Sequence, residues 1–410
     1  STLSGAWKTG QMNHLVATEQ KKSDGYIDNT DFGMSNFYYS NFLDSKKGKF
    51  AFQAGHSGKE FGANSFYTPK YPNQFEHTQT FFSSAKWESA GKFHLTPVVY
   101  YRRHFDRFEL FRENPPAWYT THNYHQTNVY GANVNSWFQW KFGKTSFGTE
   151  FRSENILSNV LGVEMNEPVK VRGENVFYTR SKSRNTTSFF FEQVYYYKNW
   201  IISGGVLANH ISGSTRGWNF FPGMEVSFRL SHEFKVFGSF NTSLRMPTFT
   251  DLYYTGPTNV GNPDLKPEKS AALEAGFRWS SSFIQVQGVV FHRQGKDMID
   301  WVKTHHEELW KPQNLTRINS LGSEMQVEMN LKKQFGNHFP NRVSISFFHN
   351  RLEKQNENII SNYVLDHLKN KITGSVHQSV LKNLTLELKF VFQDREGTYT
   401  GYLVLTTEGQ

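Results

Sequence analysis

Cysteine is absent from this 410-residue chain. The chain therefore has no disulfide framework, no thiolate metal site and no cysteine nucleophile. It also lacks any run of about 18 apolar residues, which excludes a membrane protein built from transmembrane helices. Hydrophobic residues make up only 37% of the chain, and its mean hydropathy is −0.61. The sequence is thus polar overall, and long apolar segments play no part in its fold.

The positive charge of the chain is spread out. Lys and Arg together number 45, Asp and Glu number 36, and the formal net charge is +9. The basic pairs are scattered along the sequence: Lys21 and Lys22, Lys46 and Lys47, Arg102 and Arg103, Lys332 and Lys333. Proteins that bind nucleic acids concentrate such residues on one face. We therefore expect no nucleic-acid partner.

Aromatic residues are abundant, with 38 Phe, 19 Tyr and 10 Trp making up 16% of the chain. This content argues against disorder, because disordered chains are poor in aromatic residues. Apolar and polar residues alternate in 284–290, 324–331 and 384–393. A period of two is typical of β-strands with one apolar face, and no comparably long stretch has the period of a helix. The sequence predicts an all-β fold of about 18 strands.

Short turns and long loops alternate along the chain. Long loops are expected at 21–33, 58–75, 104–123, 157–185, 211–218, 250–268, 301–316 and 354–363. The turn at 334–341 is longer than this scheme predicts. Strict alternation places the tight turns at one end of the sheet and the long loops at the other, as in outer-membrane barrels. The pattern favours a transmembrane antiparallel β-barrel over a soluble all-β protein.

The most specific motifs lie in the second half of the chain. The first stretch contains Arg245-Met-Pro247, Leu252-Tyr253, Gly261-Asn-Pro-Asp-Leu265-Lys-Pro267-Glu268 and Glu274-Ala-Gly276. The second contains Asp297-Met-Ile-Asp300-Trp301, Asn314 and Gly322-Ser-Glu324. With these motifs the chain resembles the barrel of TonB-dependent outer-membrane receptors, and is most similar to the cobalamin receptors among them. We interpret the motif residues as structural, because proline ends strands and glycine and asparagine allow the loop to turn.

The resemblance implies a 22-stranded barrel preceded by a plug domain. Residues 1–410 are then expected to form one barrel domain that lacks the N-terminal plug, the first strand and the last two strands. Such a chain alone would leave strand edges unpaired within lipid, where each unsatisfied backbone group costs several kcal/mol. We therefore expect residues 1–410 alone not to form a stable closed barrel.

The resemblance also implies a function. It predicts active, TonB-dependent import of a scarce and bulky nutrient, with cobalamin as first candidate, across the outer membrane of a Gram-negative cell. The implied partners are the ligand, the TonB energy-transducing complex acting through the plug, outer-membrane lipid and a surface lipoprotein. Ligand-binding aromatic residues are expected in extracellular loops: Trp118, Tyr119, Phe177, Tyr178, Tyr253, Tyr254, Trp301 and Trp310.

An acidic segment near the start of the chain, residues 23–31, resembles the loop with which cobalamin receptors hold calcium. Residues 66–76 resemble the neighbouring loop. Carboxylate and carbonyl oxygens are the ligands that Ca²⁺ prefers. We name Asp24, Asp28 and Asp31 as candidate calcium ligands. A solvated acidic loop without a metal is an equal alternative.

Other interpretations remain open or are disfavoured. Iron–siderophore and haem receptors share the motifs, so the ligand class stays open. Outside the family, a passive porin or adhesin barrel is the alternative, followed by a soluble carbohydrate-binding β protein. The run His305 to Glu308 is interpreted as solvated surface, not as a metal site. No Gly-x-Ser-x-Gly nucleophile elbow occurs, and we expect no enzyme.

Overall fold

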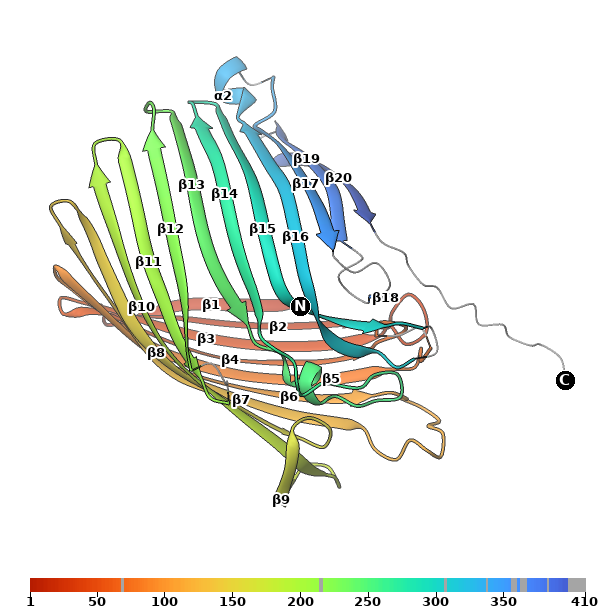
Figure 1. The fold of residues 1–410 in the computed structure, drawn as a ribbon. Coiled ribbons are helices and arrows are strands. Elements are labelled where there is room, and N and C mark those ends of the chain that lie inside the picture. Colours follow the sequence, from red (N-terminus) through yellow and green to blue (C-terminus); the bar gives the residue numbers. More distant parts are fainter. Residues whose placement is uncertain are drawn as a thin grey trace.

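In a computed structural model the described residues form one antiparallel sheet of 20 strands with two short helices (Figure 1). The structure describes residues 1–67, 70–213, 217–305, 308–336, 338–354, 360–361, 367–381 and 383–396. Within these ranges, no helix has the length and apolar character needed to cross a membrane. The predicted all-β class is confirmed.

The strands of the first half are β1 (Thr2–Thr9), β2 (Met12–Ser23), β3 (Phe32–Ser45), β4 (Gly48–Gly62), β5 (Phe75–Ser89), β6 (Phe93–Glu109), β7 (Asn123–Trp140), β8 (Gly143–Ser158), β9 (Val163–Lys170) and β10 (Phe177–Tyr197). Those of the second half are β11 (Trp200–Ile211), β12 (Trp218–Arg229), β13 (Phe234–Arg245), β14 (Glu268–Ser280), β15 (Ile284–Lys303), β16 (Lys311–Met329), β17 (Arg342–Lys354), β18 (Ile360–Ser361), β19 (His367–Leu381) and β20 (Leu384–Glu396). The helices are α1 (Phe249–Tyr253) and α2 (Leu331–Phe335).

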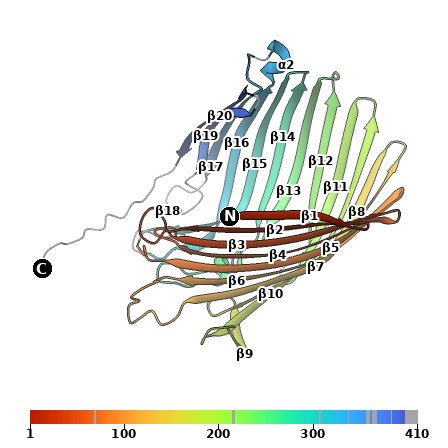
Figure 2. The ribbon, with the colours of Figure 1, turned by 180° about the vertical axis from the view of Figure 1, so that it is seen from behind.

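Eighteen of the 20 strands pair in the order of the sequence, and the other two, β9 and β18, are short additions to β10 and β15. Strands β1–β6 pass behind β11–β16 in Figure 1 and in front of them in Figure 2, so they form opposite walls of one curved sheet. Among the described residues, β1 pairs only with β2 and β20 only with β19. The described part of the sheet is therefore curved like a barrel wall and open between these two edges.

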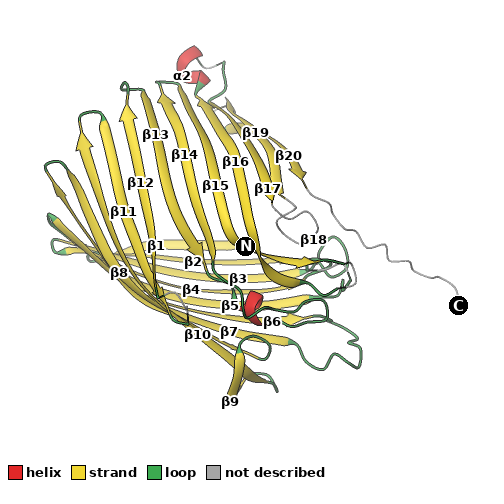
Figure 3. Cartoon of the chain, viewed as in Figure 1, coloured by secondary structure: helices red, strands yellow, loops and turns green. Residues whose placement is uncertain are grey.

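The connections alternate as the sequence predicts. Two to four residues join most strand pairs at one end, which we call the turn end, for example 46–47 and 230–233. The opposite end, the loop end, has the long connections such as 110–122 and 246–267. Figure 3 shows α2 at the turn end and α1 at the loop end. Helix α2 explains the unusually long turn at 334–341, since Asn330 caps its first turn and Gly336, at φ +93°, ends it.

Strands extend further into the predicted loops than expected. The predicted loop 157–185 contains β9 and the start of β10. The predicted loop 301–316 contains the end of β15 and the start of β16. In β9, every residue except the two valines has a side chain that is charged, amide, proline or methionine, so the segment lacks the apolar alternation that identifies a strand. Its pairing with β10 rests on backbone hydrogen bonds, which sequence periodicity does not reveal.

Most of the sheet is a single layer without a central core. Along β20, Leu386, Leu388 and Phe390 remain 50–60% exposed on one face. The opposite face of the sheet is polar: the hydroxyl of Tyr100 in β6 reaches across β7 and donates to Glu150 in β8 at 2.7 Å. This division is typical of a barrel wall between lipid and an aqueous lumen. The small buried apolar clusters, such as Tyr124 with Val171 and Tyr178, lie where loops cover strand ends at the loop end.

Candidate ligand-binding site

An aromatic cluster forms at the loop end between loops 63–74 and 110–122. The ring of Phe111 lies 5.5 Å from Tyr71, 5.6 Å from Trp118 and 5.4 Å from Tyr119, each in an edge-to-face arrangement. Trp118 remains 57% exposed. The structure thus brings together Trp118 and Tyr119, which were predicted, with Tyr71 and Phe111, which were not. Their only sequence signal is aromatic character inside a long loop.

Tyr119 is the fixed member of this cluster. Its hydroxyl accepts a hydrogen bond from the backbone N–H of Leu110 at 2.9 Å and lies 3.1 Å from Nδ1 of His122. Burial raises the pKa of Tyr119 to about 12, so the phenol stays protonated under all ordinary conditions. Tyr119 therefore anchors the loop, whereas Trp118 presents an open ring to solvent.

Loop 246–267 approaches the strands of the first half. The guanidinium of Arg184, in β10, donates to the carbonyl of Pro247 at 3.0 Å and lies 5.0 Å from the ring of Phe249. Burial raises the pKa of Tyr254, and its hydroxyl is hydrogen-bonded by the side chain of Asn123 at the start of β7. Tyr253 and Tyr254 thus share the loop end with Trp118 and Tyr119, although some 130 residues of sequence lie between the two pairs.

Three of the aromatic residues predicted in loops lie in strands. Phe177 and Tyr178 begin β10, and Trp301 belongs to β15. Tyr178 is 3% exposed and Trp301 is 7% exposed, whereas Phe177 is 46% exposed. The burial of Tyr178 and Trp301 leaves them little ring surface to offer a ligand. The prediction that they lie in loops is wrong, because polar strand extensions resemble loops in sequence; ligand binding by all eight residues stays a prediction.

The family motif forms a dense hydrogen-bonded centre behind loop 246–267. Arg245 makes two hydrogen bonds with Glu268, and Oε1 of Glu268 also accepts from the N–H of Ile299 at 2.7 Å. The side chain of Asn314 accepts from the N–H of Lys266 at 2.9 Å and donates to the carbonyl of Asp297 at 2.6 Å. These bonds hold the loop against β15 and β16, in agreement with the structural interpretation of the motif.

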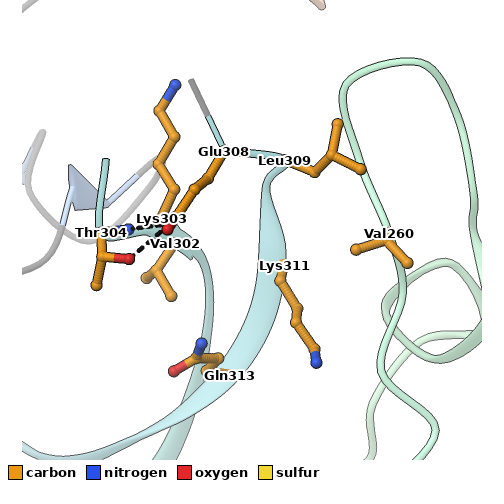
Figure 4. A pocket seen from close by; sticks show the side chains of 8 residues that line it. All are labelled: Val260, Val302, Lys303, Thr304, Glu308, Leu309, Lys311 and Gln313. Carbon is orange, nitrogen blue, oxygen red and sulfur yellow. Dashed lines mark hydrogen bonds between the residues drawn. The ribbon is translucent and has the colours of Figure 1, made fainter. Parts of the chain in front are cut away.

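A cavity of about 240 Å³ opens beside this centre (Figure 4). Its lining comes from β15, β16 and the loops beside them: Val260, Val302, Lys303, Thr304, Glu308, Leu309, Lys311 and Gln313. Glu308 accepts hydrogen bonds from the N–H and hydroxyl of Thr304 at 2.9 and 2.6 Å, which lower its pKa to about 2. The amino groups of Lys303 and Lys311 point away from each other (Figure 4). Sites for drug-sized ligands measure about 300–1,000 Å³, so this cavity is too small to hold a bulky nutrient alone.

In the candidate calcium loop, residues 23–31, one of the three candidate carboxylates is already paired with an arginine. Asp31 forms two hydrogen bonds with Arg112, which lower the pKa of its carboxyl group. Within the described part of the chain, no three His, Asp or Glu side chains gather where they could hold a metal ion. Calcium binding by Asp24, Asp28 and Asp31 therefore stays a prediction.

In the run His305 to Glu308, His305 pairs with Glu308 at 3.1 Å, and His306 and Glu307 lie outside the described residues.

Comparison with known proteins gives a family match and several relatives. Residues 16–368 match the family described as TonB dependent receptor-like, beta-barrel. The vitamin B12 transporter BtuB of Vibrio vulnificus is 32% identical over 115 residues, 28% of this chain and 18% of that protein. The vitamin B12 transporter BtuB of Photobacterium profundum is 22% identical over 200 residues, 45% of this chain and 32% of that protein. The chain thus aligns with about a third or less of these curated relatives.

Solved structures of similar fold cover nearly the whole chain. The siderophore receptor PirA from Acinetobacter baumannii has a TM-score of 0.71 at 13% identity, covering 97% of this chain and 66% of that one. The FrpB iron transporter from Neisseria meningitidis (F3-3 variant) has a TM-score of 0.69 at 11% identity, covering 95% and 65%. At such identities the likeness shows the fold alone. The chain spans about two thirds of the length of these structures.

Proposed function

Because this chain belongs to the family of TonB-dependent receptor-like β-barrels, we propose that it is the barrel of an active transporter in the outer membrane of a Gram-negative cell. The proposed cargo is a scarce, bulky nutrient, with cobalamin as first candidate. The transporter would take its energy from the TonB complex through a plug domain, and the barrel would carry out no chemistry. The apolar face of the strands, exposed along β20, would contact outer-membrane lipid.

The similarity to two vitamin B12 transporters is the observation that carries the choice of cobalamin. The aromatic cluster at the loop end supplies a surface for such a ligand. Trp118 offers an open ring, and the rings of Phe111 and Tyr119 fix its position by edge-to-face contacts. Large rigid aromatic side chains bury ligand area at low entropic cost, which suits a bulky, partly planar molecule.

Titration of cyanocobalamin into the detergent-solubilised full-length receptor, plug included, tests this proposal by calorimetry. Saturable binding with one ligand per receptor is expected. The titration is repeated with calcium and with a chelator, because a gain in affinity with calcium would give Asp24, Asp28 and Asp31 a role as ligands. Absence of binding in both conditions would reject cobalamin as the cargo.

Iron–siderophore complexes or haem are the second class of ligand. Proteins of the same fold include one named as an iron transporter and one as a siderophore receptor. The same calorimetric experiment with ferric siderophores and haem separates this class from cobalamin. A passive porin would instead bind none of these ligands and would conduct ions through planar bilayers without TonB.

A further inference from the structure

Arg112, in loop 110–122, connects three loops of the loop end. Its backbone N–H donates to the carbonyl of Asn73 in loop 63–74 at 2.9 Å. Its guanidinium reaches loop 24–31, where Nη1 and Nη2 lie 2.6 and 3.0 Å from the two carboxylate oxygens of Asp31. The same group lies 4.3 Å from the ring centre of Phe75, a residue that is 7% exposed. Arg112 thus ties the first three long loops together, through its backbone to loop 63–74 and through its side chain to loop 24–31.

Two asparagines connect two of these loops, 24–31 and 63–74, to each other. The side-chain amide of Asn29 donates to the carbonyls of Pro72 at 2.9 Å and Gln74 at 2.6 Å. The side-chain amide of Asn64 donates to the carbonyl of Asp28 at 2.8 Å. We call Asn29, Asp31, Asn64 and Arg112 the loop junction.

The donors of the loop junction bind one of the three candidate calcium carboxylates, that of Asp31, and three backbone carbonyls. Calcium takes six to eight oxygen ligands, mostly carboxylates and carbonyls. Here both carboxylate oxygens of Asp31 receive N–H groups of Arg112. The carbonyls of Asp28, Pro72 and Gln74 receive amide N–H groups, as described above. A metal ion bound by Asp31 would therefore compete with the guanidinium of Arg112 for the same carboxylate.

We propose that Arg112 is the cation that orders these loops, so that their order needs no metal ion. The planar guanidinium matches a carboxylate in a bidentate pair and stacks on an aromatic ring, which neither lysine nor a hydrated metal ion does in the same way. Arg112 directly follows Phe111, the centre of the aromatic cluster. It is therefore a positioning residue for Trp118, a role that rests on the proposed function.

Hydrogen exchange measured by mass spectrometry on the ligand-free, full-length receptor tests the proposal. In Arg112→Ala, peptides covering residues 24–31 and 70–75 should exchange about tenfold faster than in the wild type, the change expected for loss of a charge-assisted hydrogen-bonded pair. Asp31→Asn removes the negative charge of the Asp31–Arg112 pair and should accelerate exchange in the same peptides by a similar factor. Calcium or a chelator should leave the exchange of the wild-type peptides unchanged.

Two further variants show whether the pair itself matters. Arg112→Lys keeps the charge but not the bidentate geometry, and should recover only part of the lost protection. Arg342→Ala removes an arginine that pairs with Glu328 at 2.6 Å at the turn end, and should leave the peptides at 24–31 and 70–75 unchanged. If Arg112→Ala fails to fold, Asp31→Asn and Arg112→Lys give the same comparison.

Calcium-dependent protection of residues 24–31 in the wild type would overturn the proposal, as would unchanged exchange in both Arg112→Ala and Asp31→Asn. Neither result depends on a nutrient, so failure of the loop junction is separate from failure of cobalamin binding. The role in positioning Trp118 predicts in addition that Arg112→Ala weakens ligand binding and that Arg112→Lys restores part of it. Equal affinity in all three proteins would remove that role.

Discussion

The indole Nε1 of Trp301 donates a hydrogen bond to Oδ1 of Asp251 at 3.1 Å, although 50 residues separate them in the sequence. Both residues are 7% exposed. The other carboxylate oxygen of Asp251 accepts from the N–H of Thr248 at 2.9 Å and from its hydroxyl at 2.7 Å. The N–H of Asp251 donates in turn to the hydroxyl of Thr248 at 3.0 Å, which completes the capping box of α1. One carboxylate therefore caps the helix of loop 246–267 and joins that loop to β15.

Replacing Trp301 by Phe is expected to lower the free energy of unfolding by about 1–3 kcal/mol, because the buried Oδ1 of Asp251 loses its donor. Urea unfolding of the full-length receptor in detergent, followed by circular dichroism, measures this change. The matched control is Trp118→Phe, since Trp118 is 57% exposed and the same exchange there should cost no more than about 0.5 kcal/mol. Equal effects of the two substitutions would contradict the role of the Trp301 indole.

Gly261, in loop 246–267, allows the backbone to pass close to that of Leu252 and Tyr253. A Cβ at this position would lie 2.8 Å from the backbone N of Tyr253 and 2.9 Å from the carbonyl carbon of Leu252. Since these are backbone atoms, Gly261→Ala should destabilise the receptor by about 1–3 kcal/mol and accelerate hydrogen exchange in residues 254–262.

Gly204→Ala is the control for this substitution, because a Cβ on Gly204 in β11 meets no atom within 4 Å. Its stability should stay within about 0.5 kcal/mol of the wild type. A neutral Gly261→Ala variant would mean that the loop moves away at little cost.

The sequence alone predicts the strands, because side chains of a strand alternate between its two faces. It also predicts that the sheet has a turn end and a loop end, because short and long connections alternate along the chain. The alternation of Leu and Phe in 384–393 corresponds to β20. The long turn at 334–341 corresponds to α2 and the residues after it. Both signals are local, since each depends only on residues that are neighbours in sequence.

The contacts of the site depend instead on residues far apart in sequence. Asp31 and Arg112 are 81 residues apart, and they meet only because β3, β4, β5 and β6 pair in the observed registers. The sequence predicts a loop at Trp301 because the residues soon after it, from Lys303 to Glu308, are polar or charged. Its burial follows from packing against loop 246–267, which no local pattern predicts.

Trp118 is expected to contribute to ligand affinity without contributing to stability. Trp118→Ala should weaken binding of cyanocobalamin by about tenfold or more, the loss typical of an aromatic residue at the centre of a binding surface. Calorimetry gives the affinity, and urea unfolding should give an unchanged stability. Trp140→Ala, at the turn end beside Tyr195, is the matched control and should bind with wild-type affinity. A Trp118→Ala receptor that binds as tightly as the wild type would place the ligand elsewhere.

We expect Glu308 to make its hydrogen bonds with Thr304 and His305 sensitive to acid. Its hydrogen bonds with Thr304 and His305 lower its pKa from 4.5 to about 2. Because the pKa is lowered in the folded state, the contribution of Glu308 to stability is complete above pH 4.5 and is lost as the pH falls towards 2. Hydrogen exchange of residues 304–310, corrected for the intrinsic effect of pH, should therefore accelerate across this interval.

Glu308→Gln separates this effect from general acid unfolding. The amide has no carboxylate to protonate, so the loop of this variant should already exchange faster at neutral pH and should show no further change between pH 4.5 and 2. Peptides from the turn end, for example those covering residues 330–336, report general unfolding. If loop 304–310 of the wild type and of Glu308→Gln responded to acid in parallel, the hydrogen bonds from Thr304 would not be what orders the loop.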